Sequence, residues 1–125
     1  MRFLLDTNVL LIWLGNTDRV TPSMTEAILL PRNDIFFSPL SIWECRIKAA
    51  KGTLQVDEDL LDVVKSKSFA ELPFSSVHAD ETKHLPHIHH DPFDRGLIAQ
   101  ARIEGLTLLS TDSLLLRYEV AVKIA

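Results

Sequence analysis

The chain has 125 residues, 46% of them hydrophobic and 24% charged, which suits one globular domain over residues 1–125 with a single core. Its formal net charge of −4 at pH 7 argues against a protein that binds nucleic acid through overall positive charge. The one cysteine, Cys45, excludes an intramolecular disulfide and favours a cytoplasmic location, and no apolar run approaches the ~20 residues of a membrane span.

In the first half of the chain, short apolar runs alternate with amphipathic stretches of helical spacing. The predicted elements, in order, are a strand at 2–5, a helix at 7–14, a helix beginning around Pro22, a strand at 34–38 and a helix at 40–50. Glycines mark the ends of the first and last of these helices, at Gly15 and Gly52. We expect Ile42, Trp43 and Ile47 to face inward from the last helix.

The second half continues this alternation. Its predicted elements are a helix at 59–68, a strand at 71–74, a helix at 77–85, a longer helix at 91–104, and strands at 107–109 and 120–124. Short apolar strands separated by helices indicate a mostly parallel sheet with helices on both faces. The stretch 84–90 is the least regular, and we expect a solvent-exposed loop there rather than a zinc site, because its histidines lack a regular ligand spacing. These histidines are His84, His87, His89 and His90.

Acidic residues stand at the ends of the apolar elements. Asp6 follows the first strand, and Glu44 lies in the first turns of the helix after the second strand. Asp94 lies in the first turn of the helix at 91–104, and Asp112 follows the next strand by three residues. Because ligands bind beyond the carboxyl ends of the strands in an open parallel sheet, we expect these acids around one crevice. A pocket lined by so many carboxylate oxygens suits Mg²⁺ or Mn²⁺.

Each acid also has a purely structural interpretation. Asp6 and Asp112 could cap the helical turns that follow them, and Asp91, which a proline follows, is a typical N-cap. Asp94 resembles the acid of a capping box, and Glu44 taken alone is typical of a solvated helix residue. We favour a functional role for Asp6, and both interpretations stay open for the acids near the later helices. The functional case depends on all of the acids occurring together after strand-like runs.

Four segments, MRFLLDTNVLL, LSIWEC, HHDPFDRGLIAQA and LTLLSTD, resemble the PIN domain family and, more narrowly, the VapC-type toxins of toxin–antitoxin pairs. The resemblance extends from the first residue to about residue 122. It implies a three-layer α/β/α sandwich with a central, mostly parallel sheet of four to five strands. It also implies an endoribonuclease in which acids bind one or two Mg²⁺ or Mn²⁺ ions, and a metal-activated water cleaves the RNA phosphodiester bond.

Carried across residue by residue, the resemblance implies that Asp6, Glu44, Asp94 and Asp112 are the catalytic acids. Asp6 and Asp94 match the direct metal ligands, whereas Glu44, Asp112 and the nearby Asp91 would act through water or a second ion.

Polar and basic side chains accompany these acids. The resemblance implies supporting roles beside the site for Asn8, Ser110 and Thr111. Because the whole chain is acidic, RNA must be held by local basic side chains. The candidates are Arg46, Lys48 and Arg95, although each taken alone is more typical of a solvated helix face. One departure from the family is Gly96, where a larger apolar residue is common.

The resemblance also implies partners: an RNA substrate, a cognate antitoxin and a second copy in a homodimer. Trp13, Leu14, Leu29 and Leu30 could form an apolar face for an antitoxin segment, although core packing is the default interpretation.

Two other functions fit these residues less well. A phosphoacceptor receiver domain would have paired acids after the first strand, where this chain has Asp6 alone, and an aspartate directly after the third strand, where it has none. A non-catalytic PIN-like binding module usually lacks one or more of the acids, and this chain has all four.

Overall fold

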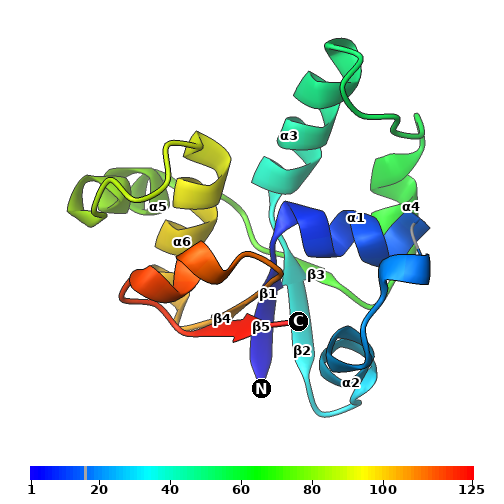
Figure 1. Cartoon of the computed structure of the whole chain (residues 1–125), viewed down its shortest axis with the longest axis horizontal. Helices are drawn as coiled ribbons and strands as arrows, with labels where there is room; N and C mark the ends of the chain where they lie inside the picture. Colours follow the sequence, from blue (N-terminus) through cyan, green and yellow to red (C-terminus); the bar gives the residue numbers. More distant parts are fainter. Residues whose placement is uncertain (16) are drawn as a thin grey trace.

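A five-stranded parallel sheet forms the centre of the computed structural model, which describes residues 1–15 and 17–125 (Figure 1). The strands are β1 (Arg2–Leu5), β2 (Asp34–Phe37), β3 (Ala70–Glu71), β4 (Thr107–Ser110) and β5 (Val122–Ile124). Their order is β3-β2-β1-β4-β5, and every neighbouring pair is parallel. The predicted mostly parallel sheet of four to five strands is confirmed.

Alternation along β1 explains why both faces of the sheet are covered. Phe3 and Leu5 pack into one hydrophobic core, whereas Leu4 packs into a second core on the opposite face. Successive side chains of a strand point to opposite faces, so this apolar run buries all three side chains. Leu108 and Leu109 of the neighbouring β4 divide between the two cores in the same way.

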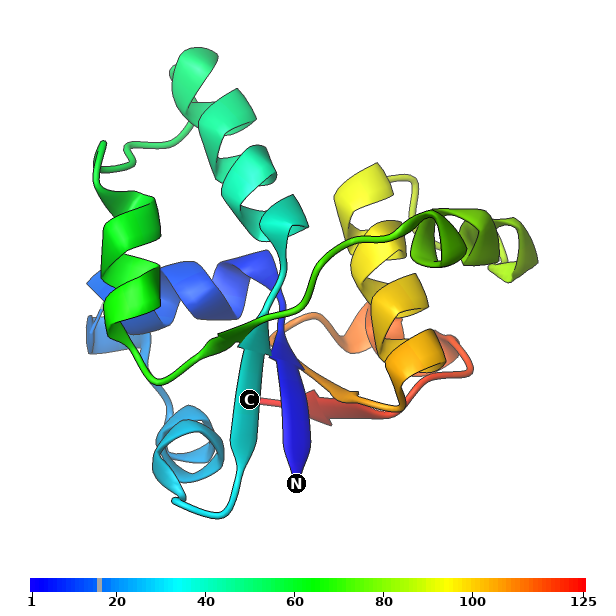
Figure 2. The same ribbon diagram turned by 180° about the vertical axis from the view of Figure 1, so that it is seen from behind.

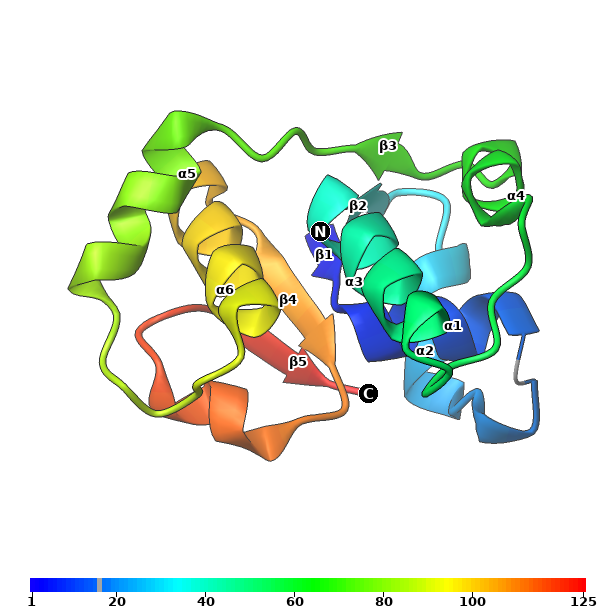
Figure 3. The same ribbon diagram turned by 90° about the horizontal axis from the view of Figure 1, so that it is seen from above.

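Helices form the two outer layers of the sandwich (Figure 2, Figure 3). They are α1 (Thr7–Gly15), α2 (Pro22–Leu29), α3 (Pro39–Ala50), α4 (Leu60–Ser66), α5 (Ser76–Glu81) and α6 (Pro92–Glu104), with 3₁₀ turns η1 (Thr17–Arg19), η2 (Thr82–His84) and η3 (Ser113–Arg117). Apolar side chains of α1, α2 and α4 fill the first core, and those of α6 and η3 fill the second. The three-layer α/β/α architecture is therefore confirmed.

The third strand is shorter and begins earlier than the predicted strand at 71–74. β3 covers only Ala70–Glu71, and the Leu72 N–H adds one more hydrogen bond to the Phe37 carbonyl at 2.8 Å. The next residue, Pro73, has no N–H to donate, so pairing with β2 ends there.

Helix α3 projects beyond the carboxyl ends of the strands (Figure 1). One stripe of this helix is buried. That stripe contains Leu40, Ser41, Glu44 and Cys45. Trp43 is 60% exposed, and its ring meets the edge of Phe93 in α6 with centroids 5.3 Å apart. The prediction that Trp43 faces inward is wrong: it borders the buried stripe and packs against Phe93 of α6 near the surface rather than in the core.

Across the described ranges, no helix combines the length and the apolar content that crossing a membrane requires.

Candidate active site

The strand order places a crevice at the carboxyl ends of β1 and β4. From β1, the chain adds β2 and β3 on one side of the sheet, and then β4 and β5 on the other. A parallel sheet binds ligands where its strand order reverses in this way. A cavity of about 550 Å³ opens at this position. Five acids from separate parts of the chain line it: Asp6, Glu44, Asp91, Asp94 and Asp112.

Asp6 is held from both sides at the end of β1. Its Oδ1 accepts the Val9 N–H at 2.8 Å, which caps α1, and its Oδ2 accepts a hydrogen bond from the Ser110 hydroxyl. Burial raises the pKa of Asp6, these two hydrogen bonds oppose the rise, and the charges of Asp112 and Glu44 add to it. The cap interpretation is correct, and it leaves lone pairs on a carboxylate that is only 6% exposed.

The three polar residues predicted beside the site connect Asp6 and the start of α1 to the end of β4 and the loop after it. Ser110 Oγ, which donates to Asp6, also accepts the Asp112 N–H at 2.9 Å. Asn8 Nδ2 donates to Thr111 Oγ1 at 2.8 Å. These bonds fix the positions of Asp6 and Asp112 relative to each other.

Glu44 has a buried carboxylate oxygen whose hydrogen bonding the described residues do not satisfy. It is 5% exposed, so the interpretation of Glu44 as a solvated residue is wrong. Its Oε2 accepts from Lys48 Nζ at 2.6 Å, which raises the pKa of the lysine, whereas its Oε1 is buried without a hydrogen-bond partner among the described residues. An unpaired buried carboxylate oxygen is costly, so a donor or a cation is expected beside it.

The two acids at the start of α6 have different surroundings. Asp91 is the N-cap, because its Oδ1 accepts the N–H groups of Phe93 at 2.8 Å and Asp94 at 3.4 Å. The Asp94 carboxylate instead faces His89, with Oδ2 3.8 Å from Nδ1. Burial, followed by the charge of Asp91, raises the pKa of Asp94 to about 7. A carboxyl group that titrates near neutrality is typical of a functional site.

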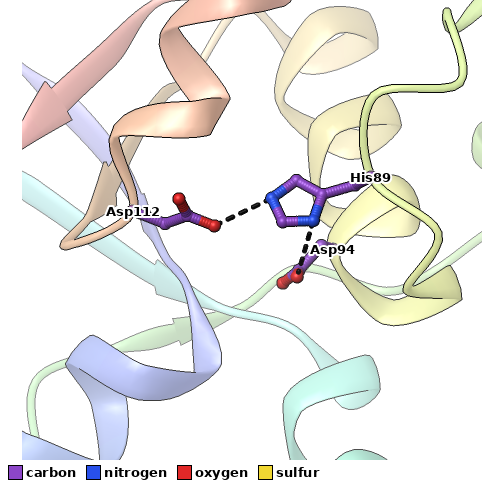
Figure 4. Close-up of side chains that lie close together, drawn as sticks. All are labelled: His89, Asp94 and Asp112. Carbon is purple, nitrogen blue, oxygen red and sulfur yellow. Dashed lines mark hydrogen bonds and ion pairs between the residues drawn. The ribbon is translucent and has the colours of Figure 1, made fainter.

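His89 enters the site from the loop at 84–90 (Figure 4). Its Nε2 lies 2.8 Å from Asp112 Oδ2, while Asp112 Oδ1 accepts the Leu114 N–H at 3.0 Å and caps η3. The predicted solvent-exposed loop is correct for His84, His87 and His90 but wrong for His89, whose side chain is 15% exposed. No local sequence signal distinguishes His89 from the other histidines of the loop, because its position depends on Tyr118, 29 residues away.

Two of the three basic side chains predicted to contact RNA hold loops in this structure. Arg46 donates to the carbonyls of Asp57 and Glu58 at 3.1 and 2.8 Å. Arg95 donates to four carbonyls of the segment before α6, those of Thr82, Leu85, Pro86 and His89. Lys48 lines the cavity with a half-exposed side chain and is the basic residue best placed for a phosphate.

Gly96 lies where α6 packs closely against the Leu40 side chain of α3. A Cβ at this position would lie 2.5 Å from Leu40 Cδ1 and 3.4 Å from Phe74 Cε1. The departure from the larger residue common in the family therefore has a packing reason. Glu44 is on α3 and Asp94 on α6, so two of the acids come from the helices that meet at this contact.

The donor set fits a divalent cation. Hard cations take carboxylate oxygens, and the unpartnered Glu44 Oε1 is such an oxygen. Among the described residues, one group of three side chains has ligand atoms within 4.8 Å of one another, and it consists of His89, Asp94 and Asp112. Asp6 and Glu44 line the same cavity beside this group.

The fold and the site together define the class of this protein. It is a parallel α/β/α sandwich with an acidic crevice at the carboxyl ends of its strands. Residues 3–120 match the PIN domain family. The chain belongs to that family.

Solved structures of toxin–antitoxin proteins share this fold. VapBC2 from Rickettsia felis bound to promoter DNA is 16% identical, with a TM-score of 0.76 over 99% of this chain and 98% of that chain. DNA-bound VapBC from Salmonella typhimurium is 19% identical, with a TM-score of 0.74 over 99% and 98%. VapBC-5 from Mycobacterium tuberculosis is 18% identical, with a TM-score of 0.59 over 98% and 96%. At these identities the likeness shows the fold. No curated protein matches the sequence.

Proposed function

We propose that this PIN domain is a metal-dependent endoribonuclease and the toxin of a toxin–antitoxin pair. The observation that carries the proposal is the gathering of Asp6, Glu44, Asp94 and Asp112 around one cavity in which a buried Glu44 oxygen has no described partner. The fold shared with VapBC proteins supports the toxin assignment.

In this proposal, Asp6 and Asp94 hold Mg²⁺ or Mn²⁺, as one or two ions, and Glu44, Asp112 and Asp91 contribute through water. When bound, the cation lowers the pKa of water and offsets negative charge at the phosphate. The other roles in cleavage, accepting a proton and positioning the phosphate, fall to side chains of the protein.

The cleavage step requires a proton acceptor and a group that positions the phosphate. Glu44 Oε1 is suited to accept the proton of the attacking water, because the other oxygen of this carboxylate is already bonded to Lys48. The water oxygen bonds to phosphorus as the bond to the leaving ribose oxygen breaks. Lys48, which is charged at neutral pH and lines the cavity, orients the phosphate.

We further propose an antitoxin partner, a homodimer and a cytoplasmic location. Of the four apolar side chains predicted to receive an antitoxin segment, Trp13, Leu29 and Leu30 line a second cavity of about 550 Å³. Leu14 lines a different cavity, beside α4. The cavity formed by the first three is the surface we expect an apolar antitoxin segment to contact.

The test is incubation of the purified chain with total cellular RNA in Mn²⁺ or in EDTA, followed by mapping of new RNA ends. We expect discrete cuts that require the metal and disappear in Asp94→Asn. Asp62→Asn, which changes an exposed acid on α4, is the matched control and should cut as the unmodified chain does. Folded, Mn²⁺-binding protein that makes no cuts would contradict the proposal and favour a binding module.

A further inference from the structure

We propose that His89 is a direct ligand of the cation, through Nδ1, beside Asp94, and that Asp112 orients its imidazole. A site with a nitrogen ligand binds Mn²⁺, Co²⁺ or Zn²⁺ in preference to Mg²⁺. This inference rests on the proposed function in one respect, that a divalent cation binds in the acidic cavity. It adds a ligand from outside the set of acids and a selectivity that an all-carboxylate site would not have.

The imidazole lies between two carboxylates (Figure 4). Nε2 is 2.8 Å from Asp112 Oδ2, and Nδ1 is 3.8 Å from Asp94 Oδ2. A neutral imidazole has one N–H, and a ring that donates it from Nε2 to Asp112 has a lone pair on Nδ1. That lone pair faces an Asp94 oxygen at a distance too long for a hydrogen bond. Two donor atoms less than about 4 Å apart can share one cation, with bonds of about 2.0–2.2 Å to each.

Asp112 has the arrangement expected of a residue that orients a metal-binding histidine. Its Oδ1 accepts the Leu114 N–H, and its Oδ2 is bonded to the imidazole, so both oxygens already have partners. A ligating histidine typically donates its second N–H to a carboxylate, which fixes the ring and makes the ligating nitrogen more basic.

Two residues outside the cavity hold His89 in this position. The His89 N–H donates to Tyr118 Oη at 2.6 Å, and the two rings stack with an interplanar angle of 10°. Arg95 fixes the rest of the loop through its four carbonyl contacts. The neighbouring His87 and His90 lack such contacts among the described residues and are exposed. A fixed and mostly buried position at an acidic cavity is therefore particular to His89.

A second, independent observation also indicates a cation. Glu44 lines the same cavity from α3, and its buried Oε1 has no hydrogen-bond partner among the described residues. The cavity therefore has at least one carboxylate oxygen that the described residues leave unpaired, and the His89 imidazole lies against two of its lining acids, Asp94 and Asp112. Mg²⁺ prefers oxygen ligands alone and retains its waters, whereas imidazole suits later transition metals.

The experiment compares Co²⁺ and Mg²⁺ binding by calorimetry to the metal-free full chain, to His89→Gln and to His87→Gln. We expect His89→Gln to weaken Co²⁺ binding at least tenfold and to change Mg²⁺ binding less than twofold. His87→Gln alters an exposed histidine of the same loop and should match the unmodified chain. Tyr118→Phe, which keeps the ring but removes the acceptor of the His89 N–H, should weaken Co²⁺ binding by a smaller factor.

A second readout follows the nitrogen itself. In histidine-¹⁵N NMR spectra, Zn²⁺ should shift Nδ1 of the one imidazole in contact with the Tyr118 ring, and Mg²⁺ should not. This measurement uses the unmodified chain, so it decides the question even if His89→Gln does not fold.

The outcomes separate this proposal from the proposed function. Equal Co²⁺ binding by His89→Gln and the unmodified chain, with binding lost in Asp94→Asn, overturns the histidine ligand and leaves the carboxylate metal site. An unmodified chain that binds neither Co²⁺, Zn²⁺ nor Mg²⁺ overturns both. Absence of a zinc-dependent shift at His89, in protein that binds Zn²⁺, also overturns the ligand proposal.

Discussion

The Ser110 hydroxyl donates a hydrogen bond to the Asp6 carboxylate across 104 positions of the sequence. Both side chains are buried, and they lie at the carboxyl ends of two neighbouring strands, the central β1 and β4. The bond therefore joins the first acid of the cavity to the loop that carries the last, Asp112.

Replacing this hydroxyl should destabilise the fold. Ser110→Ala removes a donor from a buried carboxylate, and we expect a loss of about 1–3 kcal/mol in the free energy of unfolding, measured with urea. Ser68→Ala, at an exposed serine, is the control and should stay within about 0.5 kcal/mol of the unmodified chain. An unchanged urea midpoint for Ser110→Ala would show that the hydroxyl contributes little.

The raised pKa of Asp94 predicts how the stability of the metal-free protein depends on pH. The pKa of Asp94 is about 7 in the folded state, compared with an ordinary value of 3.8, so the folded state binds an additional proton between these pH values. Stability should therefore fall as pH rises from about 4 to 7, and the buried Asp6 contributes in the same direction.

Asp94→Asn should reduce this slope, because an amide cannot ionise, and should be more stable than the unmodified chain above pH 7. The measurement is the Tm of both proteins in EDTA between pH 4 and 8. Parallel curves for the two proteins would contradict the assignment of the slope to Asp94.

Metal binding should oppose the repulsion among the acids. We expect Mn²⁺ at one hundred times its Kd to stabilise the fold by about 2.7 kcal/mol, because a ligand that binds only the folded state shifts the equilibrium by mass action. The measurement is the Tm with Mn²⁺ and with EDTA. Asp94→Asn should lose most of the shift, whereas Asp62→Asn should keep it. A Tm of the unmodified chain that millimolar Mn²⁺ leaves unchanged would count against a metal site.

The close contact of α3 with α6 predicts the effect of filling Gly96. In Gly96→Ala, the new Cβ would overlap Leu40 Cδ1, and we expect a destabilisation of about 1–3 kcal/mol, reduced by the ~1 kcal/mol that alanine gains in a helix. RNA cleavage should also fall, because Glu44 and Asp94 are forced apart.

A double-mutant cycle tests the cause. Leu40→Val removes the overlapping methyl group, so Gly96→Ala should cost less in that background, both in urea denaturation and in cleavage rate. Additive effects of the two substitutions would show that the contact does not limit the approach of the two helices.

Periodicity was sufficient to predict the sheet, because β1, β2 and β4 are short apolar runs whose side chains alternate between two cores. It was also sufficient to place Asp6 and Asp94 near the site, since both stand at the ends of strongly patterned elements. It failed for Trp43 and Glu44, because the side of α3 that is buried depends on where α6 crosses it.

His89 could not be predicted from its neighbours in the sequence. Its position depends on Tyr118, which is 29 residues away, and on the Arg95 guanidinium, which binds carbonyls of the loop. No local pattern specifies such contacts, so an irregular segment with four histidines resembles a solvated loop. The presence of β3 was predictable, but its length was not, because Pro73 limits its pairing with β2.

The central position of β1 has a consequence for synthesis of the chain. One neighbour of β1, the strand β2, follows within 40 residues, but the other, β4, begins only at Thr107. A nascent chain that ends before β4 already carries Asp6, Glu44 and Asp94, yet it lacks the hydroxyl that holds the first of them and the carboxylate that holds His89. The cavity is therefore completed only once β4 and Asp112 have been synthesised, so a shorter nascent chain has no assembled acidic site.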